Sequence, residues 1–261
     1  MRIKPRYIIL LIILFAYLLV MYLVAGKDNL RKEKLTTKLI VGNSSIWELE
    51  NKNWINIVKN TDLKDFSWTF YNIYEDDKDI GKYYLWYDEE EWYVFDKEKN
   101  PVNIEGNLLA YQANYKILVK KFTAKEVTDF AAVKKNLSDK GIDITKELTV
   151  ASSIEIDIDN DGVDEVIYLF SNAFPLESDP DEIFTYVFMK KDKATYIMYD
   201  QREENTGYVG CKPYVNHILD IDEDKKYEII LSCGRYSNQK PLDMLLEFTK
   251  DGFKVLISNN Q

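Results

Sequence analysis

Cysteine is scarce in this chain, and the two that occur do not form a recognisable motif. Cys211 and Cys233 are not a CxxC pair among the 261 residues. This argues against a zinc knuckle and against the framework of a disulfide-rich domain. Regular antiparallel pairing in this region would place Cys233 opposite Val215. A disulfide between the two would therefore need a bulge or bend, and their pairing is left open.

The chain has only one histidine, and it has no glycine-rich phosphate loop. His217 is the only histidine, and no G-x-S-x-G elbow accompanies it, which makes triad catalysis a poor interpretation. We expect His217 to be an ordinary strand residue. The absence of a glycine-rich phosphate loop argues against a nucleotide-binding site of the usual kinds.

Outside the N-terminal segment, negative charge outweighs positive charge. Residues 1–35 contain seven basic and two acidic residues, whereas the whole chain has a formal net charge of −10, so residues 36–261 carry −15. A surface of this sign repels polyphosphates and attracts divalent cations, which argues against a nucleic-acid partner. Hydrophobic residues make up 46% and aromatics 14% of the chain, enough for a sizeable core.

The longest hydrophobic run is YIILLIILFAYLLVMYLVA, residues 7–25, which carries no charge. As a helix it would extend about 28 Å, close to the hydrocarbon thickness of about 30 Å. A cleaved signal peptide is the alternative, but its apolar core typically has only about 7–15 residues. We therefore predict a single-pass anchor, with residues 1–6 as a cytoplasmic tail and residues 26–36 as a juxtamembrane linker. Basic residues flank both ends, so the orientation must come from another feature.

Short runs of β-branched and aromatic residues dominate the next part of the chain. Residues 46–58 predict a hairpin and residues 66–101 a three-stranded meander. The aromatic residues in this region either cover a core, which is the favoured interpretation, or offer a platform on which sugars stack.

A helical period follows this β region. Thr123 and Glu126 form a capping box, and apolar residues then recur at helical spacing, which predicts a helix over residues 124–139. Gly141 is a suitable stop. We assign this helix and the preceding strands to one N-terminal β domain, residues 37–147.

Residues 148–261 repeat an acidic motif. IEIDIDNDGVDEVIYLF (154–170) aligns with HILDIDEDKKYEIILSC (217–233) at a constant offset of 63. Each copy continues into a second hairpin, YVFMKKDKATYIMY or LLEFTKDGFKVLIS. Each unit is therefore expected to contain four strands, with the acidic loop between the first two, and a repeated loop is a stronger signal than a single one.

The acidic positions of these loops have the spacing of an oxygen cage for Ca²⁺. Acids at positions 1, 3, 5 and 9 and a backbone carbonyl at position 7 can surround one ion. Without a cation these carboxylates repel one another by about 1 kcal/mol per close pair even in water. The candidate ligands are Asp157, Asp159, Asp161, Val163 and Glu165 in the first loop, and Asp220, Asp222, Asp224, Lys226 and Glu228 in the second. The simpler alternative is a solvated acidic turn, because Asn-Asp-Gly forms a good turn by itself.

The pattern differs from an EF-hand, which needs an acid at position 12 and helices on both sides. Position 12 is Tyr168, and the segment EVIYLF is typical of a strand. Residues 148–261 instead resemble the FG-GAP/VCBS-type repeat of integrin-like β-propellers, in which Dx(D/N)x(D/N)Gxx(D/E) lies in a hairpin. The resemblance implies propeller-blade-like units with Ca²⁺ in their loops. Two repeats cannot close a propeller, so either they form an open sandwich or the N-terminal β domain supplies further sheets.

Position six distinguishes the two loops. The first has Gly162, whereas the second has Lys225, and a non-glycine residue at positive φ costs about 1 kcal/mol. On this ground the first loop is the better predicted site.

Taken together, the sequence predicts a mainly β (α+β) protein with Ca²⁺ as its cofactor. We expect a non-catalytic, membrane-anchored, calcium-binding β-repeat protein that binds an envelope protein or a glycan. Weak Ca²⁺ sites, with dissociation constants of about 10⁻⁴–10⁻³ M, are typical of extracellular modules, which favours a C-terminal part outside the cytoplasm. The alternative is an anchored enzyme such as a glycan hydrolase, or its accessory subunit, because a glycosidase needs only two carboxylates.

Overall fold

The computed structural model describes residues 37–42, 45–50, 53–57, 66–88, 91–113, 115–142, 148–173, 182–204, 211–234 and 241–259. Within these ranges the chain forms three antiparallel sheets and one short helix. The prediction of a mainly β protein is confirmed.

The N-terminal sheet has eight strands in the order β3-β2-β1-β8-β4-β5-β6-β7. Its strands are β1 Thr37–Val41, β2 Ser45–Glu50, β3 Asn53–Asn56, β4 Thr69–Glu75, β5 Lys78–Asp88, β6 Glu91–Phe95, β7 Pro101–Val102 and β8 Leu108–Ala113. The pairing of β2 with β3 confirms the predicted hairpin, and the pairing of β4 with β5 and β5 with β6 confirms the meander.

Each acidic repeat forms a sheet of its own. The first repeat sheet has the order β10-β11-β12-β13-β14, and the second has the order β18-β17-β16-β15-β9. The strands of the first are β10 Lys125–Glu126, β11 Val150–Ile156, β12 Glu165–Ser171, β13 Glu182–Lys191 and β14 Ala194–Glu204. Those of the second are β9 Leu118–Val119, β15 Lys212–Asp220, β16 Glu228–Gly234, β17 Leu242–Thr249 and β18 Gly252–Ser258. The expected four-strand units are present, and each gains a short fifth strand from residues 118–126.

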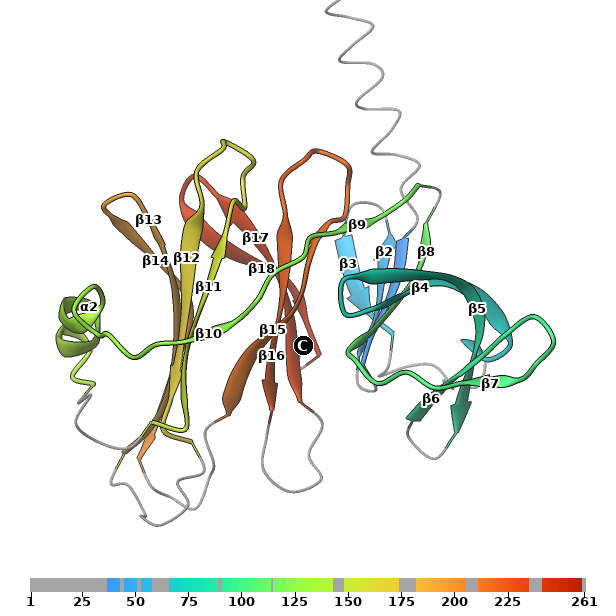
Figure 1. The fold of residues 1–261 in the computed structure, drawn as a ribbon, viewed down its shortest axis with the longest axis horizontal. Coiled ribbons are helices and arrows are strands. Elements are labelled where there is room, and N and C mark those ends of the chain that lie inside the picture. The colour runs from blue at the N-terminus through green and yellow to red at the C-terminus, as the bar shows by residue number, and fades with distance from the viewer. Residues whose placement is uncertain are drawn as a thin grey trace, which may run out of the picture.

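The three sheets stack in a row, with the second repeat sheet in the middle (Figure 1). Its core with the first repeat sheet joins residues such as Ile167 and Val187 to Leu231 and Met244. Its opposite face packs on the N-terminal sheet, through a cluster that contains Leu39, Trp47, Leu109, Leu219, Ile230 and Leu245. Packing on both faces explains why β16 is buried along nearly its whole length and shows no alternation of buried and exposed residues. Among the described residues the sheets do not close into a propeller; the N-terminal β domain instead supplies the third layer.

A buried polar contact fastens the N-terminal sheet to the middle layer. Asp243 on β17 is 1% exposed, and it accepts hydrogen bonds from Ser45 of β2 at 2.7 Å and from Ser232 of β16 at 2.5 Å. A carboxylate at this depth is tolerated because donors from two sheets converge on it.

The predicted helix over residues 124–139 is wrong in its first half. Lys125 and Glu126 form β10 and pair with Ser153 and Ser152 at the edge of β11. The open edge of a sheet offers unpaired backbone groups, and here these groups outweigh the local helical period. The helix α2 spans only Lys134–Asp139 and covers the outer face of the first repeat sheet (Figure 1). Gly141 ends it at a φ of 67°, as expected.

The predicted membrane location needs correction. Among the described residues, no helix has the length and apolar character needed to span a bilayer. The helix α2 has six residues, about 9 Å at 1.5 Å per residue, far short of a hydrocarbon layer of about 30 Å. The expected anchor at residues 7–25, with its tail and linker, lies outside the described residues.

A disulfide joins Cys211 and Cys233 in the second repeat sheet. The register of β15 against β16 shifts between Val215 and His217, so that Pro213 rather than Val215 lies opposite Cys233. This bulge brings the two cysteine Cα atoms to 5.2 Å. The pairing that regular register disfavoured is therefore made possible by one irregularity.

Removing this disulfide should destabilise the second repeat. It links residues 22 positions apart, for which loop-closure entropy predicts a stabilisation of about 3 kcal/mol. We expect Cys211→Ser combined with Cys233→Ser to lower the free energy of unfolding by about that amount, measured by urea denaturation. A double variant as stable as the parent would contradict the prediction.

The buried His217 predicts a loss of stability in acid. It is 1% exposed, and burial lowers its pKa to about 4 from 6.5, with the charge of Asp76 opposing this only in part. The unfolded chain therefore binds more protons between pH 6.5 and 4, so stability falls as the pH drops through that window, by up to about 1.4 kcal/mol per unit.

The measurement compares the parent with His217→Phe by urea denaturation at pH 7, 6 and 5. The stability of the parent should fall more steeply with decreasing pH than that of the variant. Identical slopes would contradict the prediction.

Candidate metal centre

The two acidic loops lie beside each other at the same end of the stacked repeat sheets. The first connects β11 to β12 and the second connects β15 to β16 (Figure 1). Tyr227 of the second loop donates its backbone N–H to the carbonyl of Ile158 in the first at 2.9 Å. Lys120, in the segment between β9 and β10, also joins the two loops. Its Nζ donates to the Asp157 carbonyl at 2.5 Å and lies 4.5 Å from the Tyr227 ring centroid. The loops therefore form one continuous structure.

Both loops have the same backbone path. Position four has positive φ in each, 59° at Asn160 and 60° at Glu223, and so does position six, 90° at Gly162 and 71° at Lys225. The strained conformation expected for Lys225 is thus present, and the second loop keeps it without a glycine. The repeat read from the sequence is a repeat of conformation.

Three hydrogen bonds recur at the offset of 63. The backbone N–H at position six donates to the aspartate at position one. The N–H at position seven donates to the aspartate at position five, and the N–H at position two donates to the glutamate at position nine. In the first loop these bonds join Gly162 to Asp157, Val163 to Asp161, and Ile158 to Glu165, at 2.8–3.0 Å. In the second they join Lys225 to Asp220, Lys226 to Asp224, and Ile221 to Glu228, at 2.8–3.2 Å. The acids thus order their own loops before any ion is considered.

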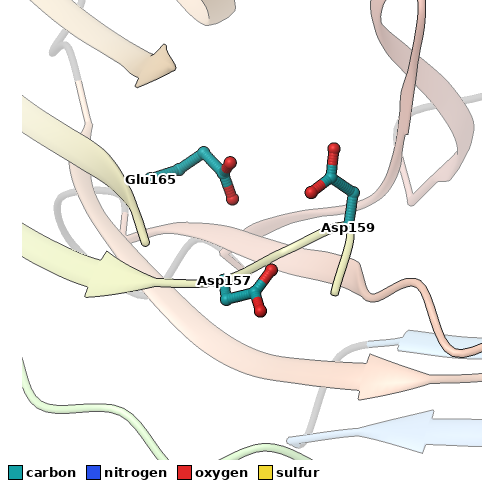
Figure 2. A group of neighbouring side chains, drawn as sticks. All are labelled: Asp157, Asp159 and Glu165. Carbon is teal, nitrogen blue, oxygen red and sulfur yellow. The ribbon is translucent and has the colours of Figure 1, made fainter. Parts of the chain in front are cut away.

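Three carboxylates converge in each loop. Asp157, Asp159 and Glu165 form the first group, and Asp220, Asp222 and Asp224 form the second; within each, one ligand oxygen per residue lies within 4.8 Å of the others. Figure 2 shows Asp159 and Glu165 turned toward each other, with Asp157 beside them.

The remaining predicted ligands lie outside these two groups. Asp161 and Glu228 belong to the same loops but not to the converging sets, and Val163 and Lys226 take part through their backbone N–H groups. The structure therefore brings together six of the ten predicted ligands as two clusters that could hold a metal ion.

Lys191 completes the first loop, and sequence reasoning missed it. Its Nζ lies 2.7 Å from Asp159, 2.6 Å from Asp161 and 2.7 Å from Glu165. Although burial disfavours the charged ammonium, hydrogen bonds to the three carboxylates outweigh this and raise the pKa of Lys191 above its usual value. The contact with Lys191 is also the main reason why the pKa of Asp161 is lowered.

In the second loop, burial works against ionisation. It raises the pKa of Asp220, and, together with the charges of Asp222 and Asp224, it raises the pKa of Glu228 to about 9; a backbone N–H from Ile221 opposes this shift for Glu228. Asp220 is 4% exposed, and its Oδ1 is buried without a hydrogen-bond partner. A buried carboxylate oxygen with nothing to bind is costly, and a cation is the partner that suits it. The donor set therefore fits a hard divalent ion.

The strand ladders explain why the two loops differ. In the first repeat Val166 pairs with Lys190, so Lys191 follows beside Glu165. In the second repeat Ile229 pairs with Leu246, so the corresponding place beside Glu228 belongs to Glu247. In the sequence, the similar turns Lys191-Asp192 and Lys250-Asp251 suggest that Lys191 corresponds to Lys250, which conceals this exchange of a base for an acid. The strand register, which only the structure provides, reveals it.

A second group of notable side chains lies on the N-terminal sheet. The Trp68 ring centroid is 4.9 Å from that of Trp86 and 5.3 Å from that of Phe95, and Lys99 Nζ lies 4.7 Å from it. Trp68 is 38% exposed and Tyr93 is 42% exposed. A φ of 59° is unusual for so bulky a residue as Trp68. We call this group the aromatic face.

The structure divides the aromatic residues of the meander between the two predicted interpretations. Tyr71 and Trp92 point into the core of the N-terminal sheet, whereas Trp86 and Phe95 join the aromatic face. Strand alternation, which sends neighbouring side chains to opposite faces, accounts for the division.

Comparison with protein-family models, with curated proteins and with solved structures finds no match to this chain. The interpretation of the site therefore depends on its geometry.

Proposed function

We propose that this protein is a non-catalytic, calcium-binding β-repeat protein of the FG-GAP/VCBS type. The observation that carries the proposal is the recurrence of a three-carboxylate cluster, on the same backbone path, at the same end of two stacked sheets. Two unrelated acidic turns would have no reason to share both features.

The choice of Ca²⁺ follows from the ligands. Both clusters offer carboxylate oxygens, the donors preferred by hard cations. The softer donors are engaged elsewhere: Cys211 and Cys233 form a disulfide, and His217 is buried in β15. Ca²⁺ accepts irregular oxygen cages more readily than Mg²⁺, which demands near-octahedral geometry.

The role of the ion in this proposal is structural. Neutralising the carboxylates removes their mutual repulsion and favours the closed loop. Tyr227 and Lys120 connect the two loops, so an ion that fixes the conformation of one loop also restrains the other loop and the segment between β9 and β10. The result is a stiff scaffold for a binding surface.

The aromatic face is the surface that we assign to ligand binding, with a glycan as the ligand. Its exposed rings, Trp68 and Tyr93, provide flat apolar surface of the kind on which sugar rings stack. The positive φ of Trp68 supports this assignment, because strained backbone conformations cluster at functional sites.

The calcium proposal predicts a rise in thermal stability. An ion present at ten times its dissociation constant adds about 1.4 kcal/mol to the folded state, which for a protein of this size is about 3–6 °C in Tm. We expect this rise in 10 mM Ca²⁺ relative to chelator, a smaller one in Mg²⁺, and none in Asp159→Asn combined with Asp222→Asn.

The matched control is Asp192→Asn combined with Asp251→Asn. These acids lie in the turns of the second hairpins, outside both loops, and their replacement changes the net charge by the same amount. This control should keep the full response to Ca²⁺. A parent protein that melts at one temperature in Ca²⁺ and in chelator would rule the proposal out.

The glycan proposal predicts a loss of binding when the exposed tryptophan is removed. Titration with a panel of soluble oligosaccharides, followed by calorimetry, should give an affinity that falls at least tenfold in Trp68→Ala. Tyr214→Ala is the control, because Tyr214 is also 38% exposed but lies on β15. Equal affinities in the parent and in Trp68→Ala would contradict the assignment.

A further inference from the structure

The first loop already contains a cation. The Lys191 ammonium contacts one oxygen from each of three carboxylates, at 2.6–2.7 Å, and two of them, Asp159 and Glu165, belong to the converging group. It is held closely, since its side chain is 19% exposed and that of Glu165 is 0% exposed. An ammonium has three donors, and all three are directed at loop carboxylates.

The second loop lacks this lysine at the matching place. The register assigns that position to Glu247, so an acid stands where the first repeat has its lysine. The second loop does contain Lys225 and Lys226, but these residues bond to Asp220 and Asp224 through their backbone N–H groups.

Each loop has one carboxylate oxygen that is buried without a hydrogen-bond partner, Oδ1 of Asp159 in the first and Oδ1 of Asp220 in the second. The other oxygen of Asp159 is bound by the Lys191 ammonium, whereas the other oxygen of Asp220 accepts from the backbone N–H of Lys225.

We propose that Lys191 is the built-in cation of the first loop, so that the protein takes up one divalent ion, in the second loop. The proposal rests on the proposed calcium function for the second loop, but the role of Lys191 stands on its own contacts. It reverses the order expected from position six, where glycine favoured the first loop.

The two loops differ in what Ca²⁺ must displace in order to bind, which supports assigning the ion to the second loop. To enter the first loop, Ca²⁺ must displace an ammonium and break three charge-assisted hydrogen bonds, each among the stronger kinds in proteins. In the second loop it would replace repulsion among acids with attraction, at the cost only of the strain that the backbone already holds at Lys225.

The test counts bound ions by isothermal calorimetry on the full-length chain with Ca²⁺. We expect one ion for the parent, two for Lys191→Met and none for Asp222→Asn. Lys193→Met is the matched control: Lys193 is an exposed lysine of the β13–β14 turn, so its loss changes the net charge equally, and one ion is expected. Lys191→Gln serves as a second variant with the same expectation as Lys191→Met.

Melting in chelator provides a second readout that needs no metal. Lys191→Met leaves three carboxylates uncompensated, so its Tm in chelator should lie below that of Lys193→Met. Adding Ca²⁺ should remove this difference in Tm. Equal melting temperatures of these two variants in chelator would overturn the role of Lys191.

The outcomes separate this inference from the calcium function. Two ions in the parent, or one in Lys191→Met, overturn the inference while leaving calcium binding intact. Binding retained by Asp222→Asn overturns the assignment to the second loop. If no variant binds Ca²⁺, the proposed function fails and so does the single-ion inference, while the chelator comparison still decides whether Lys191 holds the first loop together.

Discussion

Repulsion among carboxylates is the constraint on which the rest of this structure depends. Two loops, each with at least four acids within nine residues, meet at one end of a stack of sheets, and the stack is stable only if their charge is balanced. The chain balances part of it internally, with backbone N–H groups that donate to carboxylates such as Asp157 and Glu165 and with the Lys191 ammonium. In our proposal, the charge that these groups leave unbalanced determines where a cation binds.

The same constraint shapes the packing of the layers. The acidic loops can be neighbours because Tyr227 and Lys120 place a backbone hydrogen bond and a positive charge between them. Behind the loops, the apolar cores on either side of the second repeat sheet hold the three layers together. At the junction with the N-terminal sheet, Asp243 is also stabilised by hydrogen-bond donors, which come from two different sheets.

The two repeats are thus one backbone with two different solutions to one electrostatic problem. A lysine from the neighbouring strand solves it in the first repeat, and in our proposal a divalent ion solves it in the second. Such a division would keep the first loop closed at any calcium concentration, while the second responds to it. The aromatic face lies on a different sheet, so ligand binding and ion binding need not compete for the same residues.

Much of this protein was determined by local sequence. Strand alternation, turn residues and the offset of 63 predicted the hairpin, the meander, both four-strand units and the acids of each loop, because these features depend on neighbours along the chain. Tertiary structure alone decided the rest. The edge of β11 made Lys125–Glu126 a strand instead of a helix, and a bulge in β15 brought the cysteines together. Strand register set Lys191 beside Glu165 but Glu247 beside Glu228, because cross-strand neighbours depend on how the strands pair, which no local pattern records.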